Sequence, residues 1–211
     1  MKIALVASLV TPLLRRQAGG AQAFVADLAR GLAARHSVEV YCAAGSDVEG
    51  LELVQVPVAA GVTRALFRPD GSAASVPELR EGFERLFGEL RRRGADAVSS
   101  HAFDAEALEL AEGLPVLHTL HLPPLSPAVV AAARVTRAGL VTVSRSARLS
   151  WAAAGVRAGT IRNGVPDFDV AACGVEPVAL IPGRISPEKG TAAGVRVARA
   201  AGLAPLVVGD A

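Results

Sequence analysis

The stretch "LIPGRISPEKGT", residues 180–191, has the pattern of a strand, a loop and a helix in succession. Apolar residues 178–181 predict a short buried strand, which Pro182–Gly183 ends. Gly190 then opens an apolar run at helical spacing, residues 195–201. A strand that leads through a loop into a helix is the repeating unit of a parallel α/β sheet. We therefore expect this stretch to lie at the carboxyl end of a sheet strand.

The loop inside this stretch carries two cations, Arg184 and Lys189, on either side of Ser-Pro-Glu. Because the next helix turns its positive, amide-rich start toward the same loop, the local field suits phosphate oxygens. The chain has only two lysines, Lys2 and Lys189, and uses arginine elsewhere, which indicates that a compact point charge is wanted here. The alternative is a solvated turn whose charges are incidental.

The rest of the chain repeats the alternation of strands and helices. Period-2 and short apolar runs predict strands over residues 3–7, 37–43, 51–56, 97–100, 116–120, 140–143 and 205–208. Apolar residues at spacings of three and four predict helices over residues 21–34, 77–93, 104–112, 127–137, 146–154 and 191–201. This order predicts an α/β fold with a Rossmann-like, doubly wound parallel sheet.

Glycine and proline after residue 159 indicate a boundary between domains. We expect a first domain over residues 1–165, a linker over 166–177 and the start of a second domain over 178–211. One strand, one helix and one further strand cannot close a core by themselves. The second domain is therefore expected to be incomplete in this chain.

Composition excludes some classes of function. A formal net charge of +2 on 211 residues argues against a dedicated nucleic-acid binder. The clusters Arg15–Arg16 and Arg91–Arg93 are expected to be solvated ends of helices or loops, with peripheral contact to anionic lipid headgroups as the alternative. Cys42 and Cys173 lie far apart without metal or disulfide spacing, which favours the cytoplasm, with the inner membrane face left open. No apolar run reaches the length of a membrane span.

Residues that follow the strands are the candidates for ligand contact, because ligands of open parallel sheets gather beyond the carboxyl ends of the strands. Gly19–Gly20 precede the first helix and leave its positive end free of side chains. His101 and His121 close two strands, and each could donate a hydrogen bond to a ligand rich in hydroxyl groups. The alternatives are a plain helix start and two structural histidines.

No motif for a metal or for another nucleotide site is found. A separation of three residues on a strand puts His118 and His121 on opposite faces, so they cannot bind one ion together, and His118 is expected to be packed against a helix. No cluster has zinc spacing. G-x-G-x-x-G, the P-loop order and G-x-S-x-G are absent, which argues against dehydrogenases, kinases and α/β-hydrolases.

Four features together resemble one family. They are Gly19–Gly20, His121 in "LHTLH", "TIRNGV" at 160–165 and "IPGRISPEKG" at 181–190. In order and approximate spacing they are similar to the retaining glycosyltransferases of the GT-B fold, group 1 or family 4. The resemblance implies two Rossmann-like lobes that face each other across a cleft, with the acceptor on the first lobe and the nucleotide-sugar donor on the second.

The resemblance also implies roles for individual residues. Arg184 and Lys189 would hold the donor diphosphate, and His121 would lie near the transferred sugar. The implied donor-binding set is Gly19, Gly20, His101, Asn163, Gly183, Arg184, Glu188 and Lys189, and Arg15 and Arg16 would face the acceptor. Neither a cofactor nor a metal ion is implied, since fixed cations stabilise the departing diphosphate. From the residues alone, Asn163 with Gly164 is equally a simple turn or a pivot between lobes.

The chain departs from the family at its end, "VVGDA", before the paired glutamates spaced E-x7-E that hold the sugar and the ribose. We therefore expect a truncated glycosyltransferase that binds nucleotide-sugar weakly and transfers little or none. Two alternatives remain. One is a non-catalytic module, either a lobe that pairs with a separate chain or with itself, or a domain that only binds an acceptor. The other is another GT-B enzyme such as a sugar-phosphate epimerase. The donor's sugar and base and the acceptor are not predicted.

Overall fold

The computed structural model describes residues 1–15, 20–58, 77–167, 177–183 and 185–209. The chain forms two compact units, Met1–Pro166 and Asp167–Ala211, and each is described here by itself. Among the described residues, no helix is both long enough and apolar enough to cross a membrane.

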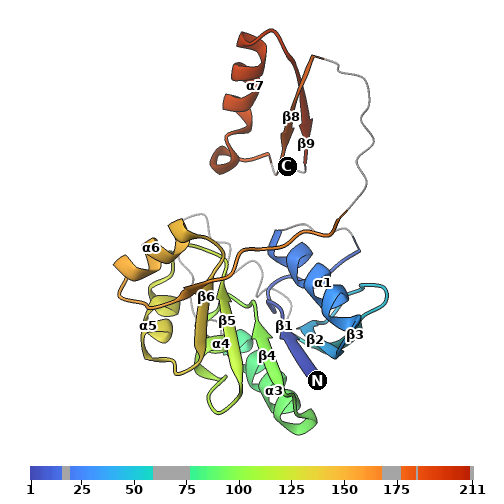
Figure 1. Ribbon diagram of the computed structural model, residues 1–211, viewed down its shortest axis with the longest axis vertical. Helices are drawn as coiled ribbons and strands as arrows, with labels where there is room; N and C mark the ends of the chain where they lie inside the picture. The colour runs from blue at the N-terminus through green and yellow to red at the C-terminus, as the bar shows by residue number, and fades with distance from the viewer. Residues whose placement is uncertain (16–19, 59–76, 168–176, 184, 210–211) are drawn as a thin grey trace. The chain divides into compact units, whose positions relative to one another are not determined.

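The first unit is built on a sheet of seven parallel strands (Figure 1). Their order across the sheet is β3-β2-β1-β4-β5-β6-β7, and every neighbouring pair is parallel. The strands are β1 (Lys2–Val6), β2 (Ser37–Ala43), β3 (Glu52–Val56), β4 (Ala97–Ser100), β5 (Val116–Leu120), β6 (Gly139–Thr142) and β7 (Gly159–Thr160). The predicted doubly wound parallel sheet is confirmed, with β7 as a short strand in a segment expected only to be extended.

Among the described residues of the first unit, five helices cover the two faces of this sheet. They are α1 (Gly20–Ala33), α3 (Pro77–Arg93), α4 (Ala105–Glu109), α5 (Pro127–Val135) and α6 (Arg145–Ala153). Alternate residues of β1 belong to different cores, as the period of a strand requires. Ala4 and Val6 pack with the α3 residues Phe83 and Phe87, whereas Leu5 packs with Val25 of α1. A third core surrounds the fully buried Trp151 and joins α5 to α6.

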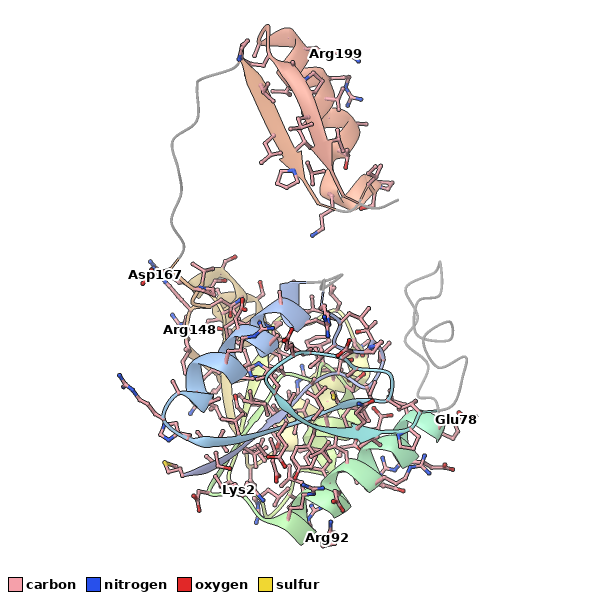
Figure 2. All side chains as sticks on the ribbon, turned by 90° about the vertical axis from the view of Figure 1, so that its right-hand side faces the viewer. Lys2, Glu78, Arg92, Arg148, Asp167 and Arg199 are labelled. Atoms are coloured by element: carbon pink, nitrogen blue, oxygen red, sulfur yellow. The ribbon has the colours of Figure 1, made fainter. Side chains whose placement is uncertain are left out.

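Both faces of β2 are buried, although its sequence alternates. Glu39 and Tyr41 alternate with apolar residues, a pattern typical of a strand with one face in water. In the structure both are buried, because α3 covers the face from which they project. The hydroxyl group of Tyr41 donates a hydrogen bond of 2.9 Å to the Glu39 carboxylate. At the same end of the first unit, Lys2 and Arg92 reach the surface (Figure 2).

The second unit has two parallel strands, β8 (Val178–Pro182) and β9 (Ala204–Val208), the short 3-10 helix η1 (Pro187–Lys189) and the helix α7 (Thr191–Ala200). The expectation that β8 is buried is wrong: Leu180 is 61% exposed, and Leu206 on β9 is 51% exposed. One helix covers only one face of a sheet, so the other face of this pair has no covering layer among the described residues.

Candidate functional site

The strand order of the first unit reverses between β1 and β4. In open α/β sheets, ligands bind in the crevice beyond the carboxyl ends of the strands at such a switch point. The connection after β1 leads into α1, which begins at Gly20, while His101 directly follows β4 and His121 follows β5. The fold therefore brings three of the predicted site residues, Gly20, His101 and His121, to the carboxyl end of the sheet.

The two histidines are in direct contact. Nδ1 of His101 lies 2.9 Å from Nε2 of His121, and the other ring nitrogen of His101 lies 3.0 Å from the hydroxyl oxygen of Ser99. The ring of Phe24, on α1, packs edge-on against both imidazoles, with centroid distances of 5.3 and 5.4 Å. Sequence reasoning did not assign Ser99 or Phe24 to the site. The signal for Ser99 is its spacing of two from His101, which places both on one face of the strand.

Burial keeps this pair neutral near pH 7. It lowers the pKa of His101 to about 3, with smaller contributions from His121 and His118, and it also lowers the pKa of His121. A bond between two neutral imidazole nitrogens holds one proton, so one ring donates and the other accepts. The remaining Nδ1 of His121 is a donor in one arrangement and an acceptor in the other. Hydroxyl groups, which donate and accept, suit either state.

The start of α1 offers space and a positive field. Gly20 is exposed, and a Cβ atom built on it would meet nothing within 4 Å. The amide groups of a helix's first turn favour anions, so an anionic ligand at this position would be stabilised. The neighbouring Gly19 lies outside the described residues. The helix start is therefore open to a ligand, and contact with a phosphate or sugar stays a prediction.

The residues expected on the acceptor side and at the pivot are at the surface. Arg15 is exposed and makes an ion pair of 3.2 Å with Asp47, while Arg16 lies outside the described residues. Asn163 is exposed in the segment that follows β7. The roles of these residues stay predictions.

In the second unit, two glycines give the loop after β8 its shape. Gly183 has φ +130° and Gly190 has φ +66°, values that favour glycine over residues with a Cβ atom. Lys189 is exposed, and its side-chain Cγ would lie 4.0 Å from a Cβ atom on Gly183, so the lysine stem lies beside the glycine. Arg184 and the side chain of Glu188 lie outside the described residues. The paired grip of Arg184 and Lys189 on a diphosphate therefore stays a prediction.

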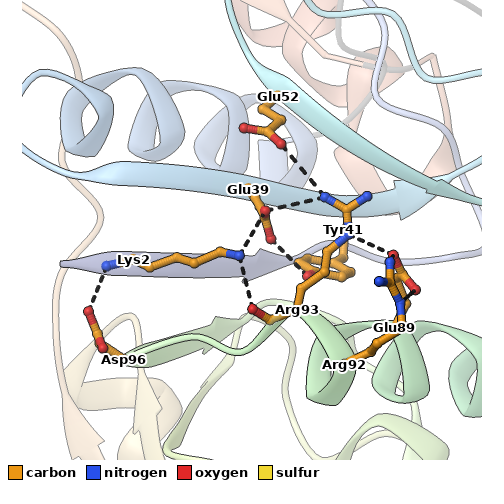
Figure 3. A network of polar contacts seen from close by, with 8 residues as sticks. All are labelled: Lys2, Glu39, Tyr41, Glu52, Glu89, Arg92, Arg93 and Asp96. Atoms are coloured by element: carbon orange, nitrogen blue, oxygen red, sulfur yellow. Dashed lines mark hydrogen bonds and ion pairs between the residues drawn. The ribbon is translucent and has the colours of Figure 1, made fainter.

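The arginines at the end of α3 are engaged within the first unit (Figure 3). Arg92 and Arg93 each lie 2.6 Å from the Glu89 carboxylate, and Arg93 also reaches Glu39 at 3.3 Å. Arg91 donates to the carbonyl oxygens of two residues after α4 at 2.7 and 3.1 Å. These contacts favour the interpretation as a stabilised helix end over contact with lipid.

His118 is buried, as expected for a packed histidine. It is 1% exposed, and burial lowers its pKa to about 4. Neither ring nitrogen has a hydrogen-bond partner among the described residues. Within the same described ranges, no group of three or more His, Cys, Asp or Glu side chains could hold a metal ion.

One more titratable group at this edge was not recognised from the sequence. Asp104 precedes α4, and burial together with the nearby Glu106 raises its pKa to about 7. One of its carboxyl oxygens is buried without a partner in the described part of the chain. In the sequence Asp104 has the pattern of a helix start, and that pattern does not reveal that the carboxyl is enclosed.

Comparison with known proteins gives the family of the chain. The model of Glycosyltransferase Family 4 matches residues 18–167, and no curated protein matches the sequence. Crystal structures with a similar fold include Anabaena Alr3699/HepE in complex with UDP and glucose (TM-score 0.66, 18% identity) and a glycosyltransferase from Rickettsia africae ESF-5 (TM-score 0.61, 14% identity). MurG from Acinetobacter baumannii has a TM-score of 0.54 at 10% identity.

These alignments cover 100%, 99% and 98% of this chain but 61%, 60% and 67% of those proteins, in the same order. The chain thus spans about two thirds or less of their length. At such low identity the likeness shows the fold, which is that of the first GT-B lobe followed by a smaller Rossmann-like unit. Since the family model covers most of the chain, the protein belongs to glycosyltransferase family 4.

Proposed function

We propose that this chain is the acceptor lobe and the beginning of the donor lobe of a retaining glycosyltransferase. The enzyme transfers a sugar from a nucleotide-diphosphate sugar to an acceptor. The observation that carries the proposal is the neutral His101–His121 pair at the switch point of the sheet, in a protein of glycosyltransferase family 4. The structures of HepE with UDP-glucose and with UDP and glucose support a donor of this class.

The second unit contributes positive charge that stabilises the departing diphosphate. As the bond between sugar and phosphate breaks, negative charge grows on the nucleoside diphosphate. Lys189, with Arg184 and the first turn of α7, supplies fixed positive charge for those oxygens. Because these cations replace a divalent ion, we propose that transfer is independent of metal, and donor binding by this chain should be unchanged by EDTA.

The first unit contributes polar contacts to the sugar. His121 lies at the carboxyl end of β5, and His101 holds one of its ring nitrogens. With that nitrogen occupied, the second nitrogen of His121 is left for a sugar hydroxyl group. Gly19 and Gly20 let the sugar or a phosphate approach the start of α1.

We further propose that the 211-residue chain alone binds donor weakly and transfers little. The support is the exposed apolar surface of the second unit, where Leu180, Val197 and Val208 are more than half exposed. The same observation favours the alternative function, a binding lobe that pairs with another polypeptide or with itself. Scattering combined with size exclusion separates these cases, because pairing gives a mass above that of the monomer.

The test of the donor site measures the binding of a panel of nucleotide-diphosphate sugars by ligand-observed NMR. Lys189→Ala and Arg184→Ala should each weaken binding about tenfold or more, because each removes a charge-assisted contact to phosphate. Arg196→Ala, an exposed cation on α7, is the matched control and should bind as the wild type. Equal binding by all three variants would contradict the assigned grip.

Two further outcomes test the class of the protein. Measurable sugar transfer by the purified chain would refute the proposed weakness of the isolated chain. An epimerase, the other enzyme considered, loses support if nucleoside diphosphates bind and Arg184→Ala abolishes their binding.

A further inference from the structure

Residues 113–166 differ in charge from the rest of the chain. This segment contains no aspartate or glutamate, although the protein has 20 acidic residues. It contains six arginines, all exposed: Arg134, Arg137, Arg145, Arg148, Arg157 and Arg162. The segment includes α5, β6, α6 and β7, which lie together at one edge of the sheet (Figure 1). The excess of positive charge is therefore concentrated on one side of the first unit.

These arginines are not neutralised within the described residues. Elsewhere in the first unit, most of the described exposed arginines pair with carboxylates, as Arg30 does with Asp27 and Arg80 with Glu109, whereas Arg35 and Arg91 make no ion pair with a described residue. None of the six makes an ion pair with a described residue, and the side-chain hydrogen bond of Arg134 is to a carbonyl oxygen at 2.9 Å. The neighbouring helix α4 does not supply a counter-charge, since Glu109 is bound to Arg80 and Glu106 is buried.

Four of the arginines lie on one continuous surface. Arg145 and Arg148 share an exposed stripe of α6 with Leu149 and Ala152, at spacings of three, four and seven. Arg148 and Arg157 line the same shallow hollow of about 340 Å³. Arg134 joins this surface because its guanidinium lies within 4 Å of a Cβ atom built on Gly155, which lines the hollow. We call Arg134, Arg145, Arg148 and Arg157, with Val135 and Leu149, the arginine face.

The arginine face combines charge with exposed aliphatic side chains. Leu149 is 53% exposed and Val135 is 78% exposed, and each follows an arginine directly. Guanidinium groups beside aliphatic side chains suit the interface of an anionic bilayer, where the cations reach the headgroups and the apolar groups enter the boundary of the acyl chains. Arg148 reaches the surface of the first unit (Figure 2).

The same segment lacks the features that a single-stranded nucleic acid requires. Its only aromatic residue is Trp151, which is fully buried, so it offers no exposed ring on which a base could stack. Exposed valine and leucine would also contribute nothing to contact with phosphates. The chemistry of this surface therefore favours lipid over nucleic acid.

We propose that the arginine face docks this chain onto the surface of an anionic lipid bilayer. Docking is separate from sugar transfer, because the arginine face includes none of the residues assigned to the donor. Each arginine near such a surface strengthens binding about fivefold, so the contact is reversible and sensitive to salt. Docking would hold the first unit at a membrane surface.

The test is co-sedimentation of the 211-residue chain with vesicles of phosphatidylcholine that contain about one third phosphatidylglycerol, at low salt. The wild type should bind these vesicles and not pure phosphatidylcholine, and added salt should release it. The triple variant Arg145→Glu, Arg148→Glu, Arg157→Glu should bind at least about 100-fold more weakly. Arg134 is left unchanged because it bonds to the backbone. Leu149→Ser should weaken binding about fivefold without changing the salt dependence.

The matched control reverses the same amount of charge elsewhere, with Arg30→Glu, Arg35→Glu and Arg85→Glu. Both triple variants have the same formal net charge, so a loss confined to the arginine face assigns binding to that surface. Equal loss in both, or no binding of the wild type to the anionic vesicles, overturns the proposal. Binding to DNA that the face variant loses, without vesicle binding, overturns it in favour of a nucleic-acid surface. Circular dichroism confirms that each variant is folded.

Discussion

The two ends of the seven-stranded sheet differ in how their buried polar groups are paired and charged. At the amino end, the buried Glu39 accepts from Tyr41 and lies 3.0 Å from Lys2 and 3.3 Å from Arg93 (Figure 3). At the carboxyl end, His101 and His121 are kept neutral, and a carboxyl oxygen of Asp104 has no partner among the described residues. The amino end holds a charged carboxylate with its partners, and the carboxyl end holds two histidines without charge.

The pKa values of Glu39 and Asp104 are shifted in opposite directions, in line with this difference. Burial by itself raises the pKa of Glu39, but hydrogen bonds from Lys2 and Tyr41 outweigh it and lower the pKa overall. No described residue donates to the buried carboxyl oxygen of Asp104, so burial, together with the nearby Glu106, raises its pKa. A paired buried charge supports the fold, whereas an unpaired buried polar group with a shifted pKa is typical of a ligand site. We infer that the amino end serves stability and that the carboxyl end is arranged for a ligand.

The strongest test of this comparison is Glu39→Ala. The change leaves Lys2, Arg93 and the Tyr41 hydroxyl group without their shared acceptor, so we expect it to lower the free energy of unfolding by about 3 kcal/mol. Because the pKa of Glu39 is lowered in the folded state, its contribution is present above the ordinary pKa and is lost as the pH falls. Urea denaturation at neutral and acidic pH measures both effects, and the loss in the variant should shrink at acidic pH.

The control for Glu39 is Glu52→Ala on the neighbouring strand. Glu52 reaches the same Arg93 at 3.7 Å, but its side chain is 60% exposed. Exposed ion pairs contribute little, so its removal should cost less than about 0.5 kcal/mol. Equal costs for the two variants would show that burial does not distinguish Glu39.

The second prediction concerns Asp104→Asn and has the opposite sign. The folded protein holds the Asp104 proton more tightly than the unfolded chain, so stability falls as the pH rises from about 4 to about 7. The amide cannot ionise, and the variant should be more stable than the wild type by about 3 kcal/mol at pH 6, with little difference at pH 4. Thermal unfolding across this range measures the change. The control is Asp47→Asn, which removes the exposed ion pair of Asp47 with Arg15. A wild type that gains stability above pH 5 relative to the variant would contradict the raised pKa.

Local pattern predicted most of the fold. The strands 97–100 and 116–120 and the helix 77–93 agree with the structure residue for residue. Periodicity shows which residues share a face, but it does not show which element covers that face. The alternation in β2 does not reveal that Glu39 and Tyr41 are buried, because α3, which covers them, comes about 40 residues later in the chain.

The site could be predicted in part for a related reason. Strands of a parallel sheet end at a common edge, which placed His101 and His121 correctly at carboxyl ends. Their contact depends on β4 and β5 being neighbours, and on Phe24 arriving from α1; strand order and helix docking are tertiary facts. The buried state of Asp104 depends on the same packing, so the sequence indicated the edge but not its electrostatics.

A smaller effect is expected for Tyr41→Phe at the amino end. The change removes the hydroxyl group that donates to Glu39 at 2.9 Å and keeps the ring in the core. Since Glu39 keeps its contacts with Lys2 and Arg93, the cost should be about 1 kcal/mol in urea denaturation. In combination with Glu39→Ala the tyrosine change should cost less than it does alone, because the two groups share one network. Additive costs would show that Tyr41 acts independently of Glu39.

A small change in stability is expected for Phe24→Leu at the carboxyl end. Leucine fills much of the same volume, so the loss of two edge-on ring contacts should cost at most about 1 kcal/mol. The imidazoles should respond more clearly: with the ring gone, water reaches His101 and His121, and their lowered pKa values should rise toward the ordinary value because burial is the main cause of the shift. NMR titration of the histidine rings measures this, with Leu28→Ala on the same helix as the control that disturbs α1 without touching the pair. A pKa of His101 that stays near 3 in Phe24→Leu would show that the sheet alone encloses the pair, and that α1 does not close this edge.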